Sequence, residues 1–174
     1  ERDINFGTSS SKNAEKSLLL YRDSFGEALI PLLSTNLGRA VYSQEFPYNL
    51  ELNGESYGMI MIELVERNIP NLLTGAPLMQ ASEKQLPTDA VSVSCTANTQ
   101  KRSGFTQLYG SIAAYPAAER IYIEVACTDG AVRVYEAFPV NVSGDADPAW
   151  ESASGYLLTL PEGIEGEVSG AYIG

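Results

Sequence analysis

The stretch that decides the fold is LLLYRDSFGEALIPLL, which runs from Leu18 to Leu33. It begins as a continuous apolar run, typical of a strand buried on both faces. It continues with apolar residues at helical spacing, which predict one buried helical stripe; these are Phe25, Ala28, Leu29, Leu32 and Leu33. Asp23 and Ser24 lie at the junction. Strand-to-helix junctions carry chemistry in many α/β proteins, but Asp and Ser are also favoured simply as helix N-caps.

The same alternation of apolar runs and helix-compatible segments continues to about residue 75. RAVYSQ, at residues 39–44, and YGMIMIELVE, at residues 57–66, are two more runs without a polar face. Strand, helix, strand, short helix and strand in this order predict parallel pairing with right-handed crossovers. Because proline has no N–H, the first helix should kink at Pro31 or restart with Pro31 in its first turn.

The second half of the chain alternates apolar and polar residues with a period of two. This pattern, with an Asp129-Gly130 turn between two runs, predicts a small antiparallel β-sandwich of about six or seven strands over residues 86–174. A polar segment precedes it, so we expect two separately packed units, residues 1–80 and 86–174, joined near residues 78–88. Cys95 and Cys127 continue the inward parity of their strands; they are either two buried thiols or one disulfide between sheets.

Composition excludes several classes of function. The net charge is −11, which argues against binding to nucleic acid. There is no histidine, so the chain alone holds neither a Ser–His pair nor an imidazole metal site, and two cysteines cannot build a zinc site. We therefore expect no metal and no other cofactor. No apolar run approaches the roughly 20 residues that span a bilayer, but the start at Glu1 suggests that an upstream part was removed, which leaves a membrane anchor there open.

Two segments carry a resemblance to a known family. LLLYRDSFGEALIPLLS and, after a spacer, YGMIMIELVERNIPNLL resemble the C-terminal half of the bacterial DHHW family. That family belongs to the SGNH-hydrolase-like proteins, which include the alginate O-acetyltransferases. The resemblance covers roughly residues 15–75 and implies a partial parallel α/β layer of the SGNH or flavodoxin-like kind in residues 1–80. In these relatives the Asp and His that complete the site lie upstream, which would account for the missing histidine.

The resemblance also implies a site. Ser24 takes the nucleophile position, supported by Asp23, and the N–H groups of Ser24 and of Phe25 or Gly26 would hold an oxyanion at the start of the helix. The other residues that the resemblance brings to this edge, as binding residues, are Arg22, Gly26, Glu66, Arg67 and Asn68. Two plainer alternatives stay open: Asp23 or Ser24 is only an N-cap, and Arg67 only pairs with Glu63 or Glu66.

The expected function is therefore that of the C-terminal portion of an extracytoplasmic, cell-envelope protein. The whole protein would be a serine esterase or O-acetyltransferase that acts on a polysaccharide or acylated glycan, and this chain would be inactive because it has no base. The alternative is a non-catalytic carbohydrate-binding or structural module of unknown oligomeric state. Its sugar-stacking aromatics would come from the second half: Tyr109, Tyr115, Tyr122, Tyr135, Trp150 and Tyr156.

Overall fold

A computed structural model describes residues 5–10, 13–51, 55–113, 120–142 and 154–174. The chain divides into two compact units, Glu1–Ile69 and Pro70–Gly174. The division comes before the polar segment at residues 78–88, where the sequence suggested the junction. The fold is rich in strands, with a mixed four-stranded sheet in the first unit and an antiparallel seven-stranded sheet in the second.

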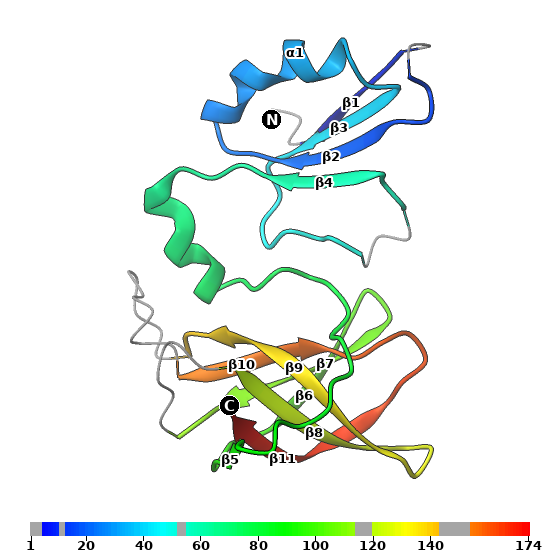
Figure 1. The fold of residues 1–174 in the computed structure, drawn as a ribbon. Helices are drawn as coiled ribbons and strands as arrows, with labels where there is room; N and C mark the ends of the chain where they lie inside the picture. Colours follow the sequence, from blue (N-terminus) through cyan, green and yellow to red (C-terminus); the bar gives the residue numbers. More distant parts are fainter. Residues whose placement is uncertain (1–4, 11–12, 52–54, 114–119, 143–153) are drawn as a thin grey trace. The chain divides into compact units, whose positions relative to one another are not determined.

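The first unit is built on a sheet with the strand order β1-β3-β2-β4 (Figure 1). Its strands are β1 Asn5–Ser9, β2 Ser17–Tyr21, β3 Arg39–Ser43 and β4 Met59–Ile62. The central strand β2 pairs in parallel with both β3 and β4, which confirms the parallel pairing predicted from the three apolar runs. β1 pairs antiparallel with β3, although its polar sequence gave no sign of a strand.

Two helical segments follow β2, and Ile30 and Leu33 in the second of them pack on the core of the first unit. The 3₁₀ helix η1, Phe25–Leu29, is followed directly by α1, Ile30–Ser34, with Pro31 in the first turn of α1 as predicted. A second 3₁₀ helix, η2, runs from Glu66 to Leu73.

The predicted helical stripe is wrong in its details. Ile30, Leu33 and Leu37 pack on the core of the first unit, whereas Phe25 and Leu32 are 63% and 65% exposed. The reason is the change from a 3₁₀ helix to an α-helix, because the two have different numbers of residues per turn. A stripe drawn at a constant helical period therefore points to the wrong face.

β4 is one of the two edge strands of the sheet, opposite β1. Its four residues, which read as a strand buried on both faces, are all exposed, and Met59 is 56% exposed. β4 pairs with β2 on one side and is the last strand on the other. An apolar run therefore marks the strand correctly but not its burial.

The second unit contains seven antiparallel strands around one apolar core. The strand order is β5-β11-β8-β9-β10-β7-β6, a single hydrogen-bonded sheet where two sheets were expected. The bounds are β5 Val91–Ser92, β6 Asn98–Arg102, β7 Phe105–Ser111, β8 Ile121–Cys127, β9 Val132–Val140, β10 Gly155–Thr159 and β11 Gly166–Ile173.

A continuous stretch, residues 91–102, connects the two edges of this sheet. It begins as β5 on β11, continues with Thr96 N–H donating to Ser111 O at 2.9 Å, and ends as β6 on β7. The sheet therefore closes on itself at the β5 end. At the other end β6 and β11 are not paired with each other.

The segment expected to be a linker belongs to the sheet of the second unit. Ala81 N–H donates to Thr159 O and Lys84 N–H donates to Val134 O, both at 2.8 Å. Residues 80–84 thus fill the space where β9 and β10 separate, because these two strands pair only at residues 138–140 and 155–157. Polar composition concealed this pairing, which is made by backbone hydrogen bonds.

The proposed aromatic face for sugars is wrong for three tyrosines, which are buried: Tyr122, Tyr135 and Tyr156. The Tyr156 hydroxyl donates to Thr96 O at 3.0 Å inside the unit. Tyr109 is half-buried, and Tyr115 and Trp150 lie outside the described residues. The buried rings serve the core, as cross-strand packing predicts.

The two cysteines are free thiols in this structure. Cys127 is buried and Cys95, which is half-buried, packs against the same core. The inward parity expected for both is therefore confirmed, and the alternative of a disulfide between them is not formed.

The core of the second unit gives a direct test of its packing. Leu158 is 1% exposed, so Leu158→Ala should lower the free energy of unfolding of this unit by about 2–5 kcal/mol. Val132 is 61% exposed, and Val132→Ala should change it by less than about 0.5 kcal/mol. Calorimetric unfolding of both variants checks this; equal effects would mean that β10 does not pack as described.

Candidate functional site

The carboxylate of Asp23 joins the ends of β2 and β4. Its Oδ1 accepts the N–H of Phe25 at 2.7 Å, and its Oδ2 accepts the N–H of Val65 at 2.9 Å, 42 residues further along the chain. The N–H of Asp23 in turn donates to Glu63 Oε2 at 3.2 Å. One side chain therefore holds the turn before η1 against the segment that follows β4.

Gly26 makes this close approach sterically feasible. A Cβ at this position would lie 2.5 Å from Glu63 Oε2 and 2.8 Å from the Cβ of Arg22. A side chain at position 26 would therefore force Glu63 or Arg22 to shift.

Ser24 is exposed and does not cap the helix. Its backbone is helical, with φ −66° and ψ −23°, and its side chain makes no capping hydrogen bond. Asp23 accepts the N–H of Phe25 instead. The N-cap alternative is therefore wrong for the Ser24 hydroxyl. The side chain that accepts a backbone N–H at this turn is that of Asp23.

Of the N–H groups expected to hold an oxyanion, those of Phe25 and Gly26 are already engaged, whereas no hydrogen bond is assigned to that of Ser24 among the described residues. Both Phe25 and Gly26 direct their N–H groups at the Asp23 carboxylate. In this conformation the carboxylate occupies the place that an oxyanion would need. The turn is thus suited to holding negative charge, and Asp23 supplies that charge from within the chain.

Arg67 lies at the same edge, as the parallel strands predicted. Its guanidinium is 5.7 Å from the centre of the Phe25 ring, a cation–π distance. Within the described residues no carboxylate forms an ion pair with Arg67, so neither Glu63 nor Glu66 is its partner.

The remaining predicted binding residues are less closely gathered. Arg22 Nη1 donates to the carbonyl of Asp23 at 3.0 Å, so it supports the turn. Glu66 is the exposed first residue of η2, and the N–H of Asn68 donates to Val65 O at 2.8 Å. Arg22 belongs to the Asp23 cluster, whereas the described contacts link neither Glu66 nor the Asn68 side chain to it.

Two residues of this cluster were not assigned to it from the sequence. Glu63 follows β4 as Asp23 follows β2, and the rule that parallel strands end at one edge would have found it. Tyr48 lies close enough that the charges of Asp23 and Glu63, after burial as the main cause, raise the pKa of its hydroxyl. No sequence pattern marks Tyr48.

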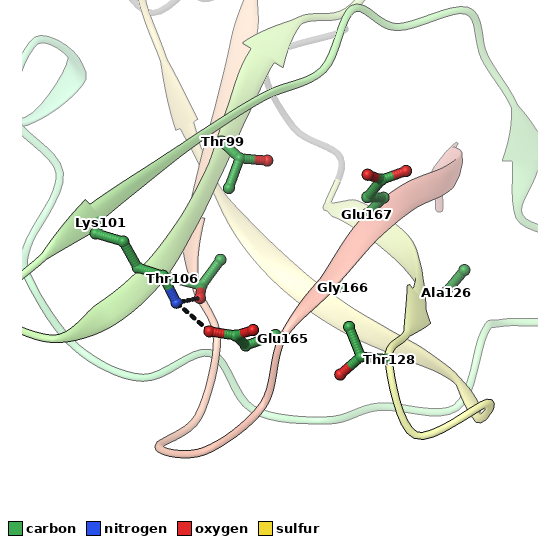
Figure 2. A pocket seen from close by; sticks show the side chains of 8 residues that line it. All are labelled: Thr99, Lys101, Thr106, Ala126, Thr128, Glu165, Gly166 and Glu167. Carbon is green, nitrogen blue, oxygen red and sulfur yellow. Dashed lines mark hydrogen bonds and ion pairs between the residues drawn. The ribbon is translucent and has the colours of Figure 1, made fainter.

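A separate hollow lies in the second unit (Figure 2). Its volume is about 410 Å³, and it is lined by Thr99, Lys101, Thr106, Ala126, Thr128, Glu165, Gly166 and Glu167. None of these residues was singled out from the sequence, because they alternate with core residues on strands and carry no motif.

Across the part of the chain that the structure describes, no three His, Cys, Asp or Glu side chains gather as a metal site would need. No helix among the described residues is long and apolar enough to cross a membrane. The chain matches no protein-family model, no curated protein and no solved structure.

The charge on Asp23 predicts a pH dependence. Burial opposes ionisation, but the N–H groups of Val65, Phe25 and Gly26 lower the pKa of the Asp23 carboxyl overall. The folded pKa thus lies below the unfolded value of about 3.9. Its contribution to stability should be complete above about pH 5 and lost as the pH falls through the folded pKa.

The measurement compares unfolding of the wild type and Asp23→Asn between about pH 7 and pH 2. The variant should be less stable at neutral pH, and the difference should shrink on acidification. Asp89→Asn, at an exposed aspartate, serves as the control. A difference that stays constant with pH would contradict a charged Asp23.

Proposed function

We propose that the first unit is the serine-bearing part of an SGNH-like acyl-transfer domain. The whole protein would be a serine esterase or O-acetyltransferase of the cell envelope, acting on a polysaccharide or acylated glycan. The 174-residue chain would be inactive by itself, because it contains no histidine.

The observation that carries the proposal is the position of Ser24. Its hydroxyl is exposed at the carboxyl end of a central parallel strand, and no helix cap uses it. Ligands in open parallel sheets bind at this edge. Arg67, which lies over the Phe25 ring beside this turn, supplies a positive charge for a carboxylate or a sugar hydroxyl.

The chemistry follows from these positions. Ser24 Oγ attacks the acyl carbonyl carbon while its proton passes to a histidine supplied from outside these 174 residues. The tetrahedral intermediate collapses, the alcohol leaves with that proton, and the acyl group stays on Ser24. A sugar hydroxyl or water then takes the acyl group and restores the serine. The N–H groups of Phe25 and Gly26 serve the oxyanion only after the Asp23 carboxylate leaves them.

The same engagement of Asp23 favours a second candidate. A turn whose N–H groups are permanently held by its own carboxylate is a structural joint, and the chain would then be a non-catalytic extracytoplasmic module. The two candidates differ in one property: whether Ser24 becomes a nucleophile when a base is supplied.

A supplied base tests this difference. The chain is treated with a fluorophosphonate, with and without free imidazole, and phosphonylation at each serine is followed by mass spectrometry. Without imidazole, Ser24 should react no faster than the exposed Ser82. With imidazole, labelling at Ser24 should exceed that at Ser82 by about tenfold, because a serine at a reacting edge gains more from a general base than a surface serine does.

Ser24→Ala is the matched control and should remove the label from that peptide without changing labelling at Ser82. Equal acceleration by imidazole at Ser24 and Ser82 would contradict the acyl-transfer proposal. The second candidate, a non-catalytic module, would then be the better explanation.

A further inference from the structure

The second unit is open along one seam, between β6 and β11. The stretch 91–102 closes the sheet at its β5 end, where β5 pairs with residues 172 and 173 of β11. Beyond that point the stretch continues as β6, which pairs with β7 and is not paired with β11. Strands β6 and β11 therefore border the 410 Å³ hollow of Figure 2 from two sides.

The free edge of β6 can be assigned from its hairpin with β7. Ser103 and Gly104, with φ of 51° and 86°, form the two-residue turn, and Arg102 faces Phe105. In such a hairpin the residues that flank the turn form a hydrogen-bonded pair, and bonded and non-bonded pairs then alternate. The N–H and C=O groups of Thr99 and Lys101 consequently point away from β7.

The free edge of β11 follows in the same way. Thr128 N–H donates to Glu165 O at 2.9 Å, so Glu165 bonds toward β8. By alternation Glu167 also bonds toward β8, while the backbone groups of Gly166 and Val168 point to the other side. Among the residues that the structure describes, the seam thus has backbone donors and acceptors without a backbone partner on both borders.

The side chains around the hollow are small or polar. Figure 2 shows Lys101 reaching Glu165 and Thr106 at one end, where Lys101 Nζ pairs with Glu165 and donates to Thr106 Oγ1 at 2.8 Å. The eight lining residues include no aromatic ring. The lining therefore lacks the stacking surface that a sugar would need.

Charge distinguishes the two glutamates. Glu165 is neutralised by Lys101, whereas Glu167 forms no ion pair within the described residues. The chain as a whole carries a net charge of −11. A ligand of this hollow should therefore bring positive charge toward Glu167.

We propose that the seam between β6 and β11 binds an extended, basic segment of a partner protein as an added strand. The main chain of the segment pairs with the free backbone groups of Thr99 and Lys101 on one border and of Gly166 and Val168 on the other. A Lys or Arg side chain of the segment lies toward Glu167. This is strand addition at an open edge, and it does not depend on the function proposed for Ser24.

The test uses the full chain and a short capped peptide of alternating threonine and lysine. Two control peptides differ from it by one property each: one carries N-methyl groups on alternate residues, and the other has glutamate in place of lysine. Amide chemical shifts of the labelled protein locate the binding. We expect shifts concentrated at Thr99, Lys101, Gly166 and Val168, and affinity at least about tenfold weaker for both control peptides.

Two variants of the protein separate the backbone from the side chain. Thr99→Pro removes the N–H that faces the seam, keeps the bonds to β7, and should weaken binding by about tenfold. Thr99→Val keeps that N–H and should bind as the wild type does. Glu167→Gln should weaken binding by about two- to fivefold and reduce its salt dependence.

Equal binding of the N-methylated peptide would overturn the proposal, since strand addition needs those hydrogen bonds. Shifts confined to an edge strand of the first unit, such as Met59–Ile62, would overturn it as well, as would no binding at any concentration. Should Thr99→Pro fail to fold, the N-methylated peptide and Glu167→Gln still test whether the segment binds as an added strand.

Discussion

The carboxylate of Asp23 is the contact on which the first unit depends. Hydrogen bonds to a charged acceptor are stronger than neutral ones. Asp23 accepts one from Phe25 in its own turn and one from Val65, 42 residues further along the chain. Because these bonds fix the ends of β2 and β4, they also fix the turn that presents Ser24. The same carboxylate occupies the N–H groups of Phe25 and Gly26. The hydrogen bonds that stabilise this turn therefore keep its N–H groups from binding an oxyanion, unless another part of the protein displaces Asp23.

In the second unit the corresponding constraint is the course of residues 91–102. This continuous stretch pairs with β11 at its start and with β7 at its end. It therefore cannot lie beside both strands along its whole length. Closing the core at the β5 end thus opens the seam at the β6 end. The hollow in Figure 2 is a consequence of this geometry.

The sequence predicted those features that depend on local pattern. Continuous apolar runs marked three strands that do pair in parallel, and alternation marked an antiparallel sheet. The Asp129-Gly130 turn lies between β8 and β9 as expected, with Gly130 at φ 83°. Proline chemistry placed the restart of the helix at Pro31. In each case a short stretch of chain contains all the information that the structure uses.

Features that depend on distant neighbours were not predictable. β4 has the sequence of a buried strand but is an edge, because burial is decided by what lies beside the strand. Residues 80–84 join the sheet through backbone groups, which every sequence has. At the site, Asp and Ser are both good caps, and only the position of the Val65 N–H, far along the chain, shows why Asp23 fills this role and Ser24 does not.

Amide hydrogen exchange in Asp23→Ala tests the role of Asp23 most directly. The N–H groups of Phe25 and Val65 should be protected in the wild type and lose about tenfold or more of that protection in the variant. The N–H of Glu63, which donates to Tyr21 O at 2.8 Å, reports the neighbouring bond between β4 and β2 and should stay protected. Unchanged protection at Phe25 and Val65 would contradict the account, because Asp23 would then not be what holds the two strand ends together.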